Sequence, residues 1–165
     1  MIVHRKSGFA LFLLMVMYVQ QAVIAAGSDI PMASNLHENA ELAQQQAVPT
    51  VVFVSREACP YCRTLRDSVL GPMYAAGKFE GRAVLVEVSL DKPEPLTGFD
   101  SQLITAKDWG QMYKAQITPT LLFLDSDGHE IGKRRIGISN LEMYGSYLQK
   151  SLDEALAITR SRATK

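Results

Sequence analysis

Short apolar runs at four places along the chain predict four β-strands. Their residues are mainly β-branched, aliphatic or aromatic, and these types pack well on a pleated sheet. Ser126-Asp127-Gly128 is a tight-turn sequence between the third and fourth runs, so these two strands are expected to form a hairpin. The predicted strands are residues 50–55, 83–90, 120–125 and 130–136.

Apolar residues at helical spacing predict four helices around these strands. Ser34 or Asn35 can cap the first helix, and Pro60 suits the first turn of the second because its missing N–H costs nothing there. Capping-box sequences begin at Thr105 and Ser139 and open the third and fourth helices. The first three helices are expected over residues 34–47, 59–76 and 105–115, and the fourth from 139 to the end of the domain at 158.

The resulting order of elements is helix, strand, helix, strand, helix, hairpin, helix. A βαβ unit followed by a helix and a hairpin predicts an α/β fold, with a central mixed sheet and helices on both of its faces. Residues 91–104 are rich in proline and glycine and are predicted to form a surface loop. Loops of this length are often functional, so we expect Phe99, Leu103 and Ile104 to contribute to a partner surface.

The composition fits one compact domain without a surface for polyanions. The chain has 165 residues, of which 47% are hydrophobic and 21% are charged. Its 17 basic and 17 acidic residues give a formal net charge of +0, which provides no electrostatic attraction to nucleic acid or to an anionic membrane surface. The sequence contains no dimerisation domain, so we expect a monomer.

The N-terminus has the three-part pattern of a secretory signal peptide. A basic start, His4-Arg5-Lys6, precedes an uncharged apolar run over residues 9–19, and small residues follow. We therefore expect residues 1–26 to be a cleaved signal peptide, with an uncleaved membrane anchor as the alternative. The parts that follow are then a flexible lead-in, the folded domain and a C-terminal tail, at residues 27–33, 34–158 and 159–165.

The candidate chemistry lies at Cys59 and Cys62, the two cysteines of the chain. A c-type haem needs a histidine directly after the second cysteine, where this chain has Arg63. A structural zinc site needs four ligands, and none of the three histidines lies at zinc-ligand spacing. A structural disulfide over so short a loop adds little stability. A redox-active pair and a pair of inert buried thiols remain, and the charged residues around the motif favour the redox-active pair.

A helix N-terminus gives this pair a physical basis for redox chemistry. Cys59 would face the unpaired N–H groups and the positive end of the helix dipole, which favour the thiolate over the thiol. Cys62, one turn further along, would lie close enough to attack a mixed disulfide formed by Cys59. We therefore assign Cys59 as the nucleophile and Cys62 as the resolving thiol, and we expect no metal or other cofactor.

The chain resembles the thioredoxin family over about residues 34–158. The resemblance rests on the strand TVVFVS, on the tetrad CPYC that opens a helix, and on ITPT directly before the strand TLLFLD. It implies the thioredoxin fold and a thiol–disulfide oxidoreductase, with a redox-active disulfide between Cys59 and Cys62.

The resemblance also implies a binding site for an extended partner chain. Pro119 in the ITPT sequence matches the family's cis-proline, which packs against the active-site disulfide. The residue matching Thr118 offers backbone hydrogen bonds to the substrate chain, as in strand addition. Pro60 and Tyr61, between the cysteines, are expected to belong to the same substrate-binding surface.

One part of the thioredoxin pattern, the buried acid, is missing. Thioredoxins usually carry this acid six residues before the first cysteine, where this chain has Phe53. Glu87 is the only acid in a core-like strand, so we hypothesise that it lies beneath the cysteine pair and accepts the proton of Cys62. The alternative is that Glu87 faces solvent or pairs with a lysine or arginine.

The whole sequence is most similar to exported bacterial thioredoxin-like proteins, including those of periplasmic sulfur-oxidation systems. This similarity implies a periplasmic protein that exchanges disulfides with protein partners and is re-reduced by a membrane electron donor. A reductase is favoured because the larger disulfide-forming oxidants carry a helical insertion. The alternatives are a disulfide-forming oxidant and a non-catalytic module that binds a partner or carries a metal through its cysteines.

Overall fold

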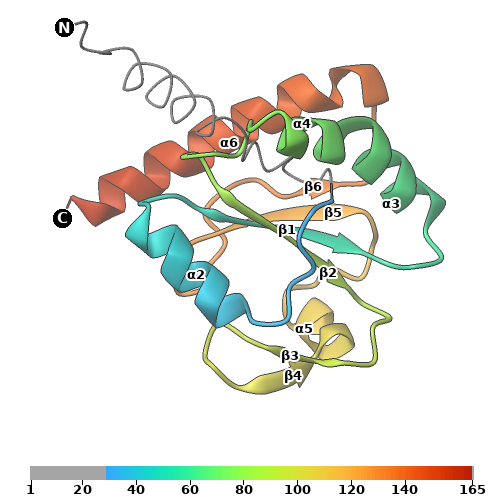
Figure 1. Ribbon diagram of the computed structural model, residues 1–165, viewed down its shortest axis with the longest axis horizontal. Coiled ribbons are helices and arrows are strands. Elements are labelled where there is room, and N and C mark those ends of the chain that lie inside the picture. The colour runs from blue at the N-terminus through green and yellow to red at the C-terminus, as the bar shows by residue number, and fades with distance from the viewer. Residues whose placement is uncertain (1–28, 165) are drawn as a thin grey trace, which may run out of the picture.

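The computed structural model describes residues 29–164 (Figure 1). The predicted signal peptide, the first residues of the lead-in and Lys165 lie outside the described residues. Among the described helices, none combines the length and the apolar character that a membrane span requires.

A four-stranded mixed sheet forms the centre of the fold, in the order β2-β1-β5-β6. β1 (Thr50–Ser55) pairs in parallel with β2 (Val84–Ser89) and antiparallel with β5 (Thr120–Leu124). β6 (Arg135–Ile136) pairs antiparallel with β5 at the far edge. Every residue of β1 is buried, which explains why its sequence is a continuous apolar run without alternation.

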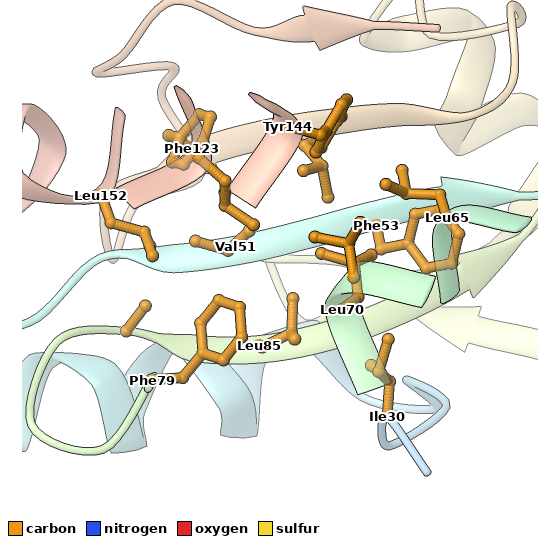
Figure 2. Close-up of a cluster of buried hydrophobic side chains, with 14 of the residues drawn as sticks. Ile30, Val51, Phe53, Leu65, Leu70, Phe79, Leu85, Phe123, Tyr144 and Leu152 are labelled. Carbon is orange, nitrogen blue, oxygen red and sulfur yellow. The ribbon is translucent and has the colours of Figure 1, made fainter. Parts of the chain in front are cut away.

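Helices cover both faces of this sheet (Figure 1). Two hydrophobic clusters lie between the layers. On one face lie α6 (Leu141–Ala163) and a three-part helix that follows β1. Figure 2 shows Val51 and Phe53 of β1 pointing into this cluster together with Tyr144 and Leu152 of α6. On the other face lie α2 (Leu36–Gln45) and α5 (Ala106–Met112), and Leu36 and Trp109 are fully buried there. The predicted α/β fold with helices on both faces of a mixed sheet is thus confirmed.

The helix predicted over residues 59–76 is interrupted by a wider turn. It consists of α3 (Pro60–Leu65), the π-helical segment η1 (Arg66–Leu70) and α4 (Gly71–Ala75). The Gly71 N–H donates to the Arg66 carbonyl, which is a bond over five residues. Pro72 follows and has no N–H to donate, so a regular α-helix would lose a bond at this point. The wider turn carries the chain past the proline without ending the helix.

The segment predicted as a surface loop at 91–104 contains regular structure. β3 (Pro95–Thr97) and β4 (Leu103–Thr105) pair as a small antiparallel sheet, and Leu96 packs into the cluster beneath α5. The sequence did not predict these strands, because each has only three residues and turn-forming residues lie around them. The strand predicted at 130–136 is shorter than expected, since only Arg135 and Ile136 pair with β5 beyond a single bridge at Glu130.

Both ends of the described chain are more ordered than the sequence predicts. Residues 29–33 were expected to be part of a flexible lead-in, but Ile30 is buried and Met32 forms a parallel bridge with Glu87 of β2. The Glu87 N–H donates to the Pro31 carbonyl at 2.8 Å, and the Glu87 carbonyl accepts from the Ala33 N–H at 2.7 Å. At the other end, α6 continues to Ala163, through most of the segment expected to be a tail.

Candidate active site

Cys59 lies where β1 passes into α3, and it caps that helix. Its backbone is extended, and Pro60 follows as the first helical residue. Cys59 and Cys62 are joined by a disulfide with an S–S distance of 2.15 Å. The predicted disulfide pairing is therefore present, at the N-terminus of α3.

The two sulfurs differ in exposure. Cys59 keeps 9% of its surface exposed, while Cys62, a residue of α3, is fully buried. Disulfide exchange needs access of a thiolate to a sulfur atom, so a partner can reach Cys59 and cannot reach Cys62 directly. The geometry agrees with the predicted roles of an attacking Cys59 and a resolving Cys62.

Two hydrogen-bond donors point at the Cys59 sulfur. The Cys62 backbone N–H lies 3.1 Å from Cys59 Sγ, and the Thr118 hydroxyl lies 3.5 Å from it. Donors of this kind stabilise a thiolate more than a neutral thiol, because bonds to charged groups are stronger. Once the disulfide opens, these two groups favour the nucleophilic form of Cys59.

Thr118 and Pro119 lie directly beside the disulfide. Their peptide bond is cis, and the Pro119 carbonyl accepts a hydrogen bond from the Gly137 N–H at 2.8 Å. Within residues 29–164, no hydrogen bond engages the backbone N–H or C=O of Thr118. An extended partner chain could therefore pair with these groups next to Cys59.

Three exposed apolar residues are neighbours of the site residues in the sequence or in the sheet. Tyr61 is 68% exposed, Ile117 is 66% exposed and Ile136 is 53% exposed. Tyr61 follows Pro60 in the helix, Ile117 precedes Thr118, and Ile136 lies opposite Thr120 in the sheet. Of these three residues, only Tyr61 is predicted from the sequence to belong to the substrate-binding surface. Ile117 could have been found from its place in the ITPT sequence, but the contribution of Ile136 depends on the pairing of β5 with β6.

Glu87 is buried in β2, with 2% of its surface exposed, and lies opposite Phe53 of β1. Its carboxylate accepts hydrogen bonds from the Ser55 hydroxyl and from Arg66 of η1, whose Nε lies 3.0 Å from Glu87 Oε2. The bond to Glu87 raises the pKa of the Arg66 guanidinium. The sequence left open whether Glu87 faces solvent or pairs with a lysine or arginine. The structure shows that Glu87 is buried and pairs with Arg66. Within the described chain, no hydrogen bond joins Glu87 to either cysteine.

Replacing Thr118 with valine is expected to slow the alkylation of Cys59 in the reduced protein. Valine keeps the shape of the side chain and removes the hydroxyl donor to Cys59 Sγ. The loss of one hydrogen bond predicts a rate about two- to tenfold lower at pH 7. The measurement is the rate of reaction with iodoacetamide. Thr64→Val, at an exposed position on the same helix as Cys62, is the control and should leave the rate unchanged.

A second cluster of polar side chains lies away from the cysteines. Asp125, Asp127 and His129 place their ligand atoms within 4.8 Å of one another. The Asp125 carboxylate already accepts hydrogen bonds from Arg162 and from the backbone N–H groups of Asp127 and His129. The Asp125 carboxylate thus stabilises the turn that follows β5, and this role accounts for the cluster without a metal.

Comparison with known proteins gives one family match. Residues 36–151 match the model of a family described as thioredoxin-like domain. No curated protein matched the chain.

Several solved structures share the fold. The oxidoreductase DsbH has a TM-score of 0.58 at 20% identity, over 82% of this chain and 92% of that one. A thioredoxin from Thermus thermophilus has a TM-score of 0.57 at 23% identity, over 83% and 95% of the two chains. Mitochondrial thioredoxin 3 from Saccharomyces cerevisiae, in its oxidised form, has a TM-score of 0.51 at 19% identity, over 78% and 98%.

Proposed function

The chain belongs to the thioredoxin-like family, and from this premise we propose that it reduces disulfides of protein partners in the cell envelope. The fold and the Cys59–Cys62 pair support a thiol–disulfide oxidoreductase at the general level. The observation that carries the proposal is the asymmetric disulfide, with one accessible and one buried sulfur. This disulfide lies beside Thr118, whose backbone N–H and C=O form no hydrogen bond within the described chain.

In the proposed reaction, two thiols of this protein become a disulfide while the partner disulfide becomes two thiols. The Cys59 thiolate attacks one sulfur of the partner disulfide, forms a mixed disulfide and releases the partner's other sulfur as a thiolate. Cys62 then loses its proton and attacks Cys59 Sγ. This second step releases the partner and closes the Cys59–Cys62 disulfide seen in the structure. A membrane electron donor would return two electrons to the pair.

We propose that the partner binds as an extended strand across the Thr118–Pro119 segment. The Thr118 backbone would pair with the partner backbone, and this would place a partner sulfur against Cys59. Tyr61, Ile117 and Ile136 offer apolar surface on either side of this strand. The contacts with the backbone are independent of partner sequence, so they suit a protein that serves more than one substrate.

We also propose that Glu87 accepts the proton of Cys62. Its burial in β2 supports this role, as does the position of its partner Arg66, which directly follows the cysteine helix α3. Since no direct bond links Glu87 to Cys62 within residues 29–164, the transfer would require an intervening water.

The reduction potential of the Cys59–Cys62 pair tests the direction of the reaction. We expect a value below about −240 mV, near that of reducing thioredoxins, when the pair is equilibrated with glutathione. The fraction of oxidised protein can be measured by mass spectrometry after the thiols are trapped. A value above about −150 mV would overturn the reductase and indicate a disulfide-forming oxidant.

A further inference from the structure

The residues between β1 and Cys59 have little support from regular structure. Arg56, Glu57 and Ala58 lie outside the sheet, and Glu57 and Ala58 are exposed. Exposed segments with few backbone hydrogen bonds open readily. Yet this segment carries Cys59, whose sulfur lies near the Thr118 hydroxyl and the Cys62 amide. The position of Cys59 therefore depends on the contacts that hold these residues.

Asp91 holds the segment from the side of β2. Both oxygens of its carboxylate accept from the Glu57 backbone N–H, at 3.1 and 3.0 Å, and one also accepts from the Ser89 hydroxyl at 2.7 Å. The Ser89 hydroxyl, and to a lesser extent the Glu57 N–H, lower the pKa of Asp91. The carboxylate is thus charged at neutral pH and binds a backbone group two residues before Cys59.

Arg56 holds the segment from the side of β5. Its Nη1 donates to the Gln116 carbonyl at 3.1 Å, two residues before Thr118. The charges of Arg56 and Asp91 also attract each other, which contributes to the lowered pKa of Asp91. Since β1 lies between β2 and β5, its end is tied to the residues that flank both neighbouring strands.

These contacts matter most when the disulfide is open. In the oxidised protein, Cys59 is held covalently to the buried Cys62. In the reduced protein that bond is gone, and hydrogen bonds alone keep Cys59 Sγ beside its two donors. A contact that fixes Cys59 therefore stabilises the reduced form more than the oxidised form.

We propose that Arg56 and Asp91 are positioning residues for the exchange reaction, and that they hold the Cys59 thiolate against Thr118 in the reduced protein. The proposal rests on the proposed function. It assigns a role to two residues that touch neither sulfur and that lie on separate segments of the chain. Their loss should make the reduced form less stable, slow the reaction of Cys59 and shift the pair towards the disulfide.

The test compares Arg56→Gln and Asp91→Asn with the wild-type protein in two measurements. One is the rate at which reduced Cys59 reacts with iodoacetamide at pH 7, which should fall about two- to tenfold, the range expected for one hydrogen bond. The other is the equilibrium with oxidised and reduced glutathione, which should shift towards the protein disulfide by the same factor. A tenfold shift corresponds to about 30 mV for this two-electron couple.

Matched controls come from an exposed pair away from the site. Arg82 donates to Asp153 at 2.6 Å, so Arg82→Gln and Asp153→Asn repeat the same chemical changes there. Both should match the wild-type protein in both measurements. A purely structural role of Arg56 and Asp91 would lower the free energy of unfolding of the oxidised and reduced forms alike and leave the glutathione equilibrium unchanged.

The outcomes separate this inference from the proposed function. If the wild-type pair equilibrates with glutathione and either variant equals it in both measurements, the positioning role of that residue is wrong. If the wild-type pair fails to exchange with any disulfide, the proposed function itself fails, whatever the variants do. Shifts in both variants, with unchanged controls, support the inference.

Discussion

Replacing Cys59 with serine is expected to abolish the reduction of a protein disulfide, while replacing Cys62 with serine is expected to trap the partner. Serine at position 59 removes the cysteine sulfur that a partner can reach, because Cys62 is fully buried. Serine at position 62 leaves the first attack intact and removes the thiol that resolves the mixed disulfide. The Cys59→Ser variant should therefore act at the rate of the uncatalysed reaction.

Gel electrophoresis without reductant and mass spectrometry can detect the trapped species. Cys62→Ser should give a covalent complex that dithiothreitol releases, and Cys59→Ser should give none. The double variant serves as the control for adventitious crosslinking. A stable complex formed by Cys59→Ser through Cys62 would contradict the assignment of roles, since it would show that the buried sulfur is the one that reacts with partners.

Replacing Arg66 with methionine is expected to lower the free energy of unfolding by about 2–3 kcal/mol. The change keeps the apolar part of the side chain and leaves the Glu87 carboxylate, 2% exposed, without its cation. The effect should fall below the ~3–5 kcal/mol typical of a fully buried pair, because about a third of the Arg66 side chain is exposed to water. Urea unfolding of the oxidised protein measures the difference.

Two further variants separate the explanations for this loss. Arg82→Met breaks an exposed ion pair with Asp153 and should cost less than about 1 kcal/mol. Adding Glu87→Gln to Arg66→Met should regain most of the lost stability, since the buried charge is then absent. Equal losses in Arg66→Met and Arg82→Met would show that the burial of Glu87 is energetically unimportant.

Glu87→Gln alone also decides whether Glu87 accepts the Cys62 proton. Glutamine can still accept a hydrogen bond from Ser55 but cannot take up a proton at neutral pH. We expect slower closure of the mixed disulfide at neutral pH, with the difference from the wild-type protein shrinking at higher pH. An unchanged pH dependence would leave Glu87 with a structural role as the counterion of Arg66.

Much of the fold could be predicted from local sequence signals. The strand at 50–55 was found with correct bounds because it is buried on both faces and reads as a continuous apolar run. Asn35 and Thr105 accept hydrogen bonds from the third residue of their helices, as predicted. The fourth helix is capped by Asn140, one residue after Ser139, where the predicted capping box begins. The cysteine roles stay predictions, and they rest on the position of Cys59 at a helix N-terminus with Cys62 one turn further along.

The remaining features depend on contacts between distant segments, which local patterns do not contain. The strands β3 and β4 are too short to show a repeat, and they form because Leu96 packs beneath α5. The order of residues 30–33 depends on the outer edge of β2, which the sequence pattern cannot place. The Arg56–Gln116 contact joins residues 60 positions apart, so only the folded chain brings them together.

The pairing of residues 31–33 with β2 has a consequence for the solubility of the protein. β2 is an edge strand of the central sheet, and its residues from Leu85 to Ser89 are buried and largely apolar. Exposed apolar edge strands are templates for aggregation, and proteins guard against this by covering them or by placing proline there. Here Met32 occupies the edge at Glu87, and Pro31, which has no N–H to offer, lies beside it. The short segment before α2 thus protects the sheet against edge-to-edge association, and a truncated protein that begins at α2 would lose this protection.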